Sequence, residues 1–442
     1  MSEFPNSPEE FYALRDDRTN RCISNGVYQS AVCAVVLSPE IAHTLSGQVM
    51  FLAAANLLSR WCRTVTLVVA PVAPHPLLGL GMDDLAEATL SQMRDADPFG
   101  GFRVATSPVT SEIALVIGPH DQAVTASATV FIDSAGWLAS IGYDSQIKLP
   151  ITTDKNCLGA VAAACLGVAQ MFKVATGVPV DRYFRKGIFD LFLLNWLDGN
   201  ATPQSAPWPF DLSIGRALMV GAGSVGSAAV YCTRLAGLTG SLTIADKDLI
   251  KVENFNRSPI FGRGTFDLTK SSAVAQFLHG SSLHAHSLPL WWNELVEQQE
   301  RSSFDFDVWF PLANEFNVRF SMQNNFPPLM IHASTTANWG VNHGRHLPGR
   351  DDCLADRFPV QVSKENLTCA TGQIEHKDGE GIDAALPFSS LFAGLLVTAD
   401  LVRTQIPAGT EFCSLRLVWL LRMHSGLGPP SARWMHLHSA EP

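Results

Sequence analysis

Apolar residues recur along the chain in two patterns, which are short continuous runs and longer stretches with helical spacing. A first strand, helix and strand are predicted over residues 28–37, 46–61 and 64–70. The same order returns later, with a strand, a helix and a strand over residues 217–220, 227–235 and 243–245. This alternation predicts an α/β fold with two Rossmann-like repeats in one chain.

The resemblance between the two halves continues downstream. Residues 156–173 and 388–403 are both rich in small residues and have an apolar face, so a similar helix is expected to close each repeat. Residues 126–141 are expected to correspond to residues 307–320 in the same way. The chain therefore looks like a pseudodimer built from two copies of one domain.

Proline, glycine and small residues over 199–209 indicate a connection between the copies. The predicted divisions are an N-terminal segment, a first domain, a linker, a second domain and C-terminal strands, over residues 1–28, 29–198, 199–215, 216–403 and 404–442. Within the second domain, residues 349–387 form a predicted crossover loop, which is polar and contains glycine.

The chemistry of a phosphate site is present in the second copy alone. Gly221, Gly223 and Gly226 lie between the predicted strand and helix, and Asp246 follows twenty positions after Gly226. That is the dinucleotide-binding fingerprint, in which glycines admit a phosphate, the helix N-terminus offers N–H donors and the acid accepts from a ribose hydroxyl. In the first copy, residues 38–40 read Ser-Pro-Glu at the equivalent turn. We expect the first domain to be degenerate and the second to be active.

A glycine fingerprint alone would also suit an oxidoreductase that uses a nicotinamide or flavin cofactor. Here the fingerprint is followed by further polar residues at fixed positions, Asp248, Asn254, Arg257 and Lys270. The combination resembles the ubiquitin-activating enzymes and their bacterial relatives, the adenylyltransferases of molybdopterin and thiamine biosynthesis. It is most similar to the activating enzymes of bacterial ubiquitin-like conjugation systems used against phage.

This resemblance implies that the glycine loop binds ATP and that Asp246 holds the ribose. Asn254, Arg257 and Lys270 would line the triphosphate, where planar and point cations spread the charge of a phosphoryl transition state. Family members usually have an Asp that helps to hold Mg²⁺ at the position of Asn314. Asn keeps an oxygen ligand but loses the charge, so a magnesium site here would also need Asp248 or Glu315.

The resemblance also implies a nucleophilic cysteine in the crossover loop, and Cys369 occupies that position, nineteen residues before Phe388. Cys353 is the rival, although it matches better a zinc corner in which Asp356 replaces the second thiol. The nine cysteines form no CxxC pair, so neither zinc nor a disulfide framework is expected. Cys157, Cys165 and Cys232 fall in apolar helical patterns and are predicted to lie in the core.

In the family, an arginine from an N-terminal segment reaches the ATP phosphates. The candidates for this role are Arg15, Arg18 and Arg21. Three ordinary surface arginines are the alternative interpretation, and the local sequence does not choose between the three positions.

Composition narrows the function further. The chain has 442 residues, 47% of them hydrophobic, and a formal net charge of −10, with no basic run that would neutralise nucleic-acid phosphates. The first residues are acidic and lack the apolar core of a signal peptide, and the apolar stretch over 158–172 is shorter than a membrane span. We therefore expect a cytoplasmic protein that binds neither nucleic acid nor membrane.

The function implied is ATP-dependent adenylation of the C-terminus of a ubiquitin-like protein. A thioester on Cys369 and transfer to a conjugating enzyme would follow. Two alternatives stay open: a sulfur-carrier adenylyltransferase that makes a thiocarboxylate, and a non-catalytic scaffold that has lost magnesium at Asn314.

Overall fold

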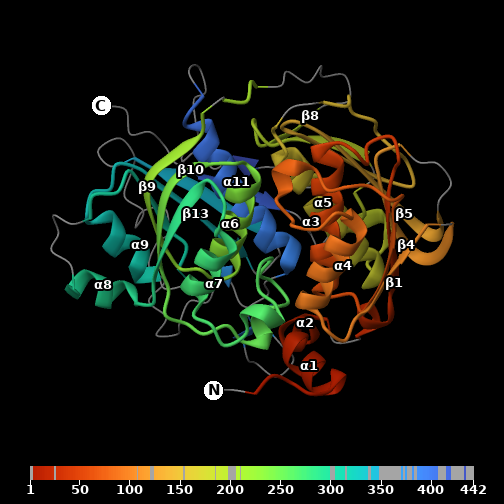
Figure 1. Cartoon of the computed structure of the whole chain (residues 1–442), viewed down its shortest axis with the longest axis horizontal. Coiled ribbons are helices and arrows are strands. Elements are labelled where there is room, and N and C mark those ends of the chain that lie inside the picture. Colours follow the sequence, from red (N-terminus) through yellow and green to blue (C-terminus); the bar gives the residue numbers. More distant parts are fainter. Residues whose placement is uncertain are drawn as a thin grey trace.

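A computed structural model describes most of the chain, and Figure 1 shows two α/β bodies side by side. The N-terminal half, red to yellow, lies on the right and the C-terminal half, green to blue, on the left. The described residues are 3–23, 26–106, 108–119, 124–152, 155–184, 186–197, 206–209, 211–298, 304–313, 316–336, 340–347, 370–371, 374–375, 381–382, 386–406, 415–419 and 433–434.

The N-terminal half contains one sheet with the strand order β3-β2-β1-β4-β5-β6-β7-β8. Its strands are β1 (Val32–Leu37), β2 (Thr64–Val68), β3 (Gly101–Ala105), β4 (Val109–Ile117), β5 (Val124–Ala135), β6 (Leu138–Tyr143), β7 (Lys186–Asp190) and β8 (Asn195–Leu197). Its helices are α1 (Pro8–Arg15), α2 (Asp17–Cys22), α3 (Leu45–Ser59), α4 (Leu85–Ala96) and α5 (Leu158–Ala175), with the 3-10 helices η1 (Val27–Ser30), η2 (Pro76–Leu78) and η3 (Val180–Arg182).

The C-terminal half contains a sheet with the order β11-β10-β9-β12-β13-β14-β18-β19. Its strands are β9 (Ser213–Val220), β10 (Thr239–Ala245), β11 (Leu283–Leu288), β12 (Val308–Pro311), β13 (Met330–Thr336), β14 (Gly340–His346), β18 (Leu415–Trp419) and β19 (Arg433–Trp434); β15 (Ala370–Thr371) pairs with β13, and β16 (Ile374–Glu375) pairs with β17 (Gly381–Ile382). Its helices are α6 (Ser224–Leu235), α7 (Lys270–Phe277), α8 (Trp292–Gln298), α9 (Phe316–Gln323) and α11 (Pro387–Arg403), with η4 (Val252–Asn254) and η5 (Arg263–Thr265).

The two sheets agree strand by strand. In each, five strands are parallel to one another and three antiparallel strands complete the sheet. In each, a helix follows the central strand, α3 after β1 and α6 after β9, and a long helix connects the sixth strand to the seventh, α5 and α11. The expected fold class, two Rossmann-like repeats of the adenylation type, is confirmed.

One expected correspondence between the repeats is wrong. Residues 126–141 lie in β5 and β6, which occupy the sheet positions of β13 and β14. Residues 307–320 instead contain β12, the counterpart of β4. The error arose because α9 separates β12 from β13, whereas only residues 118–123 separate β4 from β5. Counting apolar runs along the chain therefore skipped one strand in the first half.

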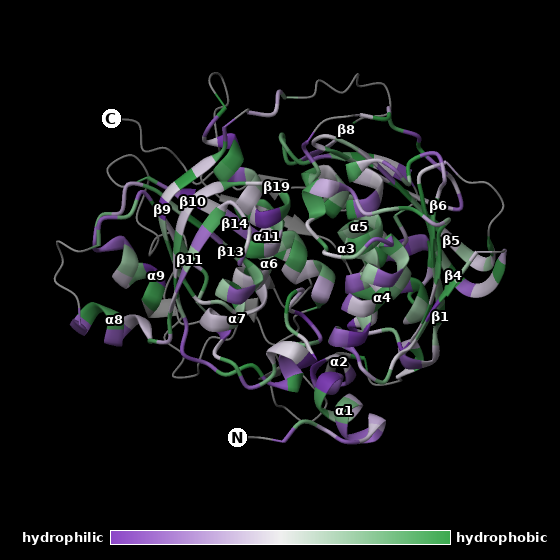
Figure 2. Ribbon diagram, in the orientation of Figure 1, coloured by the Kyte–Doolittle hydropathy of each residue, from purple (hydrophilic) through white to green (hydrophobic). Residues whose placement is uncertain are grey.

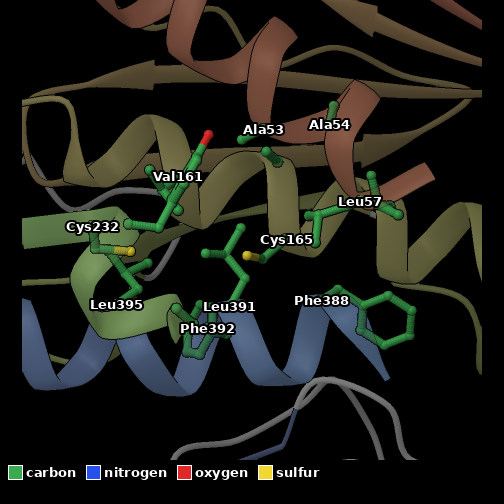
Figure 3. Close-up of a cluster of buried hydrophobic side chains, with 14 of the residues drawn as sticks. Ala53, Ala54, Leu57, Val161, Cys165, Cys232, Phe388, Leu391, Phe392 and Leu395 are labelled. Carbon is green, nitrogen blue, oxygen red and sulfur yellow. The ribbon is translucent and has the colours of Figure 1, made fainter. Parts of the chain in front are cut away.

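The halves share one hydrophobic core. Helix α5 packs against α3 in its own half and against α11 of the other half, and α11 packs against α6. Figure 3 shows side chains from all four helices meeting, among them Leu57, Cys165, Cys232 and Leu391. Figure 2 shows hydrophobic residues along α3 and α5 in this layer and hydrophilic residues along α2. Cys157, Cys165 and Cys232 are all fully buried, so their predicted place in the core is confirmed.

Helix α5 is shifted by two residues from the helix predicted over 156–173 and extends three residues beyond the apolar stretch over 158–172. It has 18 residues and is long and apolar enough to cross a bilayer. In the structure, however, 94% of this window is buried inside the fold. Its packing against α3, α11 and β5 accounts for the apolar composition as that of a core helix.

Lys173, in the last turn of α5, is 4% exposed and donates to the carbonyl oxygen of Arg182 at 3.3 Å. Burial lowers the pKa of Lys173 from 10.5 to about 8. Between these values the unfolded chain binds more protons than the folded one. The contribution of Lys173 to stability is therefore fully present above pH 10.5 and is lost as the pH falls through 8.

We predict that Lys173→Met raises the free energy of unfolding at pH 7 by about 2 to 3 kcal/mol. Between pH 8 and pH 9.5 the free energy of unfolding of the wild type should rise relative to that of the variant. Urea unfolding at several pH values measures this difference. Parallel pH profiles for the two proteins would contradict the assignment.

Candidate functional site

The glycine loop joins β9 to α6, and each of its glycines has a different environment. Gly221 has a φ of +97°, and a Cβ placed there would lie 2.4 Å from the backbone nitrogen of Ala313. A Cβ on Gly226 would lie 2.2 Å from the carbonyl oxygen of Gly221. A Cβ on Gly223 would meet no atom within 4 Å. Gly221 and Gly226 therefore permit tight packing, and Gly223 leaves the loop open to a ligand.

The N-terminus of α6 faces the same loop, because Gly223 is its N-cap residue. The first N–H groups of a helix have no partner inside the helix and attract anions. The neighbouring Ser224 Oγ is buried and has no hydrogen-bond partner among the residues that the structure describes. Sequence reasoning did not single out Ser224, although its position within the glycine motif could have indicated it.

Asp246 stands at the end of β10 and fixes the glycine loop. Its Oδ2 accepts a hydrogen bond from the Ala222 N–H at 2.7 Å, and its Oδ1 accepts one from the Asp248 N–H at 3.0 Å. Burial raises the pKa of Asp246, while Lys270 acts in the opposite direction. A carboxylate oxygen can accept more than one hydrogen bond, so acceptor capacity is left for a ligand hydroxyl.

Lys270 lies beside these carboxylates, in the first turn of α7. Its Nζ is 2.6 Å from Asp248 Oδ2, and its backbone N–H donates to the Asp248 carbonyl at 2.8 Å. The Ser271 hydroxyl donates to the Asp246 carbonyl at 2.7 Å. The glycine loop, Asp246, Asp248 and Lys270 are therefore one connected unit.

The next turn carries Asn254 and Arg257. Asn254 Oδ1 accepts from the Lys251 N–H at 2.9 Å, which closes the turn of η4. Arg257 donates from Nη1 to the Glu253 carbonyl and to Asn256 Oδ1, the latter at 2.9 Å, and its side chain is largely buried. Contacts of these two side chains with a triphosphate stay a prediction.

Several predicted site residues lie outside the described residues, namely Asn314, Glu315, Cys353 and Cys369. Their roles as magnesium ligands, zinc corner and nucleophile stay predictions. Within the described part of the chain, no group of three or more His, Cys, Asp and Glu side chains is arranged to hold a metal ion.

Of the N-terminal arginine candidates, Arg15 has a structural role. It is fully buried and donates to Asp16 at 2.7 Å, to Asp97 at 2.5 Å and to the Ser59 carbonyl at 3.2 Å. Such a closed set of acceptors leaves the Arg15 guanidinium no room for a phosphate. Arg18 and Arg21 remain the candidates for that contact, and the side chain of Arg21 lies outside the described residues.

The class of protein follows from this fold and this site. A pair of Rossmann-like repeats, with a glycine loop, an acid at the end of the second strand and a lysine after it, defines an adenylation-type α/β protein. Comparison with protein families agrees. Residues 211–427 match the model of the ThiF family, and residues 33–185 match that of the BilD N-terminal domain.

One curated relative is "Uncharacterized protein y4jF" from Sinorhizobium fredii (strain NBRC 101917 / NGR234). It is 26% identical over 346 residues, which cover 76% of this chain and 62% of that protein. The chain thus spans less than two thirds of the length of this relative.

Similar solved structures include those described as E. coli MccB with MccA-N7isoASN and with succinimide. Both are 17% identical to this chain, with TM-scores of 0.37 and 0.36, and the matches cover 46% of this chain and 61% and 60% of those chains. The structure described as SeMet PaaA is 14% identical, with a TM-score of 0.35, over 47% of this chain and 61% of that chain.

Proposed function

We propose that the C-terminal half binds ATP at the glycine loop and transfers the adenylyl group to the C-terminal carboxylate of a protein substrate. One observation carries the proposal: the open backbone at Gly223 lies at the N-terminus of α6, beside a loop that Asp246 and Lys270 fix. This arrangement supplies helix N–H donors and a cation for phosphates and an acid for a ribose. The ThiF family match of this half supports the same function.

In the proposed reaction, a carboxylate oxygen of the substrate forms a bond to the α-phosphorus of ATP. The bond from that phosphorus to the bridging oxygen breaks, and pyrophosphate leaves with the electron pair. Negative charge grows on the bridging oxygen as this bond breaks. Lys270 and Arg257 are the described cations that we assign to this charge, because fixed donors stabilise developing charge most effectively.

Magnesium, when bound, would neutralise the phosphates of ATP. We assign Asp248 as the described ligand, with Asn314 and Glu315 as the further candidates. These donors fit a hard cation, because Asp248 offers carboxylate oxygens. The Asp248 side chain is 45% exposed, so a metal ion can reach it. In the structure Asp248 Oδ2 pairs with Lys270 Nζ at 2.6 Å, so Asp248 would hold the metal next to the cation that we assign to the phosphates.

The substrate we propose is a ubiquitin-like protein, and the resemblance to ubiquitin-activating enzymes supports this choice. The Cys369 thiolate would attack the carbonyl carbon of the acyl-adenylate, forming the thioester as AMP leaves. A conjugating enzyme would then accept the acyl group on its own cysteine. Adenylation is required first because a free carboxylate has no good leaving group.

The glycine loop gives a matched pair of variants that separates ligand binding from folding. Gly223→Ala adds a methyl group in open space at a φ of −71°, so the free energy of unfolding should change by less than about 1 kcal/mol. ATP affinity should fall about 10-fold or more, because the methyl group occupies the path of a phosphate. Fluorescence titration with an ATP analogue measures this loss.

Gly226→Ala is the partner variant. Its methyl group would contact the Gly221 carbonyl, and we expect a loss of about 1 to 3 kcal/mol in the free energy of unfolding. Unchanged ATP affinity in Gly223→Ala, with normal stability, would argue against phosphate binding at this loop.

The proposed thioester is tested on a non-reducing gel with Mg²⁺, ATP and the ubiquitin-like protein encoded beside the gene. We expect an ATP-dependent band that disappears on treatment with thiol. A thiocarboxylate on the partner without this band would favour the sulfur-carrier alternative. Absence of the band and of any pyrophosphate release would favour the scaffold.

We also propose that the protein works in the bacterial cytoplasm, in a conjugation system directed against phage. The match to the BilD N-terminal domain and the resemblance to activating enzymes of such systems support this context. Cells that carry the intact operon should reduce phage plating relative to cells with Lys270→Met in this gene. Equal plating on both strains would contradict the proposed role.

A further inference from the structure

The loop that carries Arg257 is held by the other half of the molecule. Arg60, the C-cap residue of α3, donates to three backbone carbonyls of this loop. Its Nη1 lies 2.6 Å from the Phe255 oxygen and 3.0 Å from the Phe261 oxygen, and its Nη2 lies 2.7 Å from the Pro259 oxygen. Arg257 therefore lies between two residues whose carbonyls Arg60 binds.

Asn56, one turn earlier on α3, completes the contact. Its Oδ1 accepts from Arg60 Nε at 2.8 Å, and its Nδ2 donates to the Pro259 carbonyl at 2.9 Å. Both polar groups of the Asn56 amide are therefore used, one to orient the guanidinium and one to bind the loop. We call Arg60 and Asn56 together the α3 clamp.

The clamp satisfies three acceptors that receive no backbone hydrogen bond within the described part of the chain. Among the described residues, no backbone N–H donates to the carbonyls of Phe255, Pro259 or Phe261. All three residues are buried. Each buried carbonyl left without a donor would cost about 1 to 3 kcal/mol, so the loop conformation depends on the clamp.

The arrangement is unfavourable as a purely structural device. Arg60 is 2% exposed, and among the described residues its hydrogen-bond partners are carbonyls and an amide rather than a carboxylate. Burial lowers the pKa of Arg60 to about 9, and Asp95 and Tyr231 offset part of this effect. A well-packed apolar side chain is often as stabilising as a buried charge. The geometry therefore suggests a positional role for the buried guanidinium.

Two further contacts fix the same region from the N-terminal half. Helix α1 packs against η4, where the Phe4 and Phe11 rings lie 6.3 Å from the Phe255 ring. Asp95, in α4, accepts from the Gly264 N–H at 2.7 Å. The segment from η4 to η5 therefore contacts the N-terminal half at both of its ends.

We infer that Arg60 and Asn56 are positioning residues for the phosphate-binding step, acting through Arg257. The N-terminal half lacks a glycine loop, and its α3 clamp makes it a required support for the loop that contacts ATP. The inference rests on the proposed function, because it assigns Arg257 to the phosphates of ATP.

The test is a double-mutant cycle with ATP–pyrophosphate exchange as the readout, in the full-length chain with its ubiquitin-like partner. Arg60→Met should lower kcat/KM for ATP by about 10- to 100-fold, because the loop loses its fixed position. Arg60→Lys should recover part of this loss, since a lysine keeps the charge but cannot bind three carbonyls at once. Asn56→Ala, which keeps the guanidinium, should give a smaller loss of the same kind.

Arg257→Met supplies the background that separates positioning from general destabilisation. If Arg60 acts through Arg257, Arg60→Met should have no further effect on kcat/KM in that background. Lys173→Met is the matched control, because it removes another buried cation of the N-terminal half, one that donates to the Arg182 carbonyl and not to the loop. It should leave the kinetics unchanged.

The outcomes are distinct. Losses that multiply in the double variant, or an Arg60→Met protein with wild-type kinetics, would overturn the inference while leaving adenylation intact. No exchange by the wild-type protein would overturn the proposed function, and this inference with it. Thermal unfolding of each variant identifies any that fail to fold, and the milder Asn56→Ala protein then provides the cycle.

Discussion

Replacing Lys270 with methionine is expected to lower the rate of pyrophosphate exchange by about 100- to 1,000-fold. Removal of one fixed donor from a developing negative charge has an effect of this size in other enzymes. The side chain of Lys270 is 13% exposed, and its Nζ lies 2.6 Å from Asp248 Oδ2. Its charge is therefore oriented before ATP arrives. Methionine keeps the length of the side chain and removes the charge alone.

The matched control is Lys247→Met, in the same turn after β10. Lys247 pairs with Glu294 at 2.6 Å and is 46% exposed, so its replacement removes a positive charge without altering the glycine loop. Its exchange rate should stay within about twofold of the wild type. Equal losses in the two variants would mean that Lys270 acts through net charge only, and no loss in Lys270→Met would contradict its assignment to ATP.

The second large effect is expected from Cys369→Ala. The variant should form no thiol-sensitive adduct with the ubiquitin-like protein, because the sulfur that accepts the acyl group is absent. Pyrophosphate exchange should persist at the wild-type rate, since it depends on the glycine loop and the cations and not on the thiol. The non-reducing gel and the exchange assay therefore report the two steps separately.

Cys353→Ala is the control for this prediction, as the rival cysteine of the same predicted loop. It should keep the adduct. Loss of the adduct in Cys353→Ala but not in Cys369→Ala would identify Cys353 as the nucleophile. An adduct that survives both substitutions would contradict thioester formation within residues 349–387.

The sequence predicted the fold class because its two signals, the apolar patterns and the glycine spacing, depend on residues close together in the chain. The apolar runs and helical patterns that predicted the fold class correspond to β1, α3 and β2, and to β9, α6 and β10. The glycine spacing predicted the loop that joins β9 to α6. The correspondence between β5 and β12 failed because strand order in a sheet is a long-range property that a pattern of short runs does not contain.

The α3 clamp could not have been predicted in this way. Arg60 follows an apolar helix and reads as an ordinary C-terminal cation, and its three acceptors are backbone atoms about 200 residues away. Carbonyl oxygens carry no sequence signature. Arg15 was likewise misleading, because the acceptor Asp97 that closes its ion pair lies in a different element.

The most direct test of the central claim is ATP–pyrophosphate exchange with the ubiquitin-like partner in two forms. One form ends in its natural C-terminal carboxylate, and the other has that carboxylate converted to an amide. Adenylation predicts rapid exchange with the carboxylate form and none with the amide. Exchange that is equal with both forms, or absent with the carboxylate form, would contradict the account.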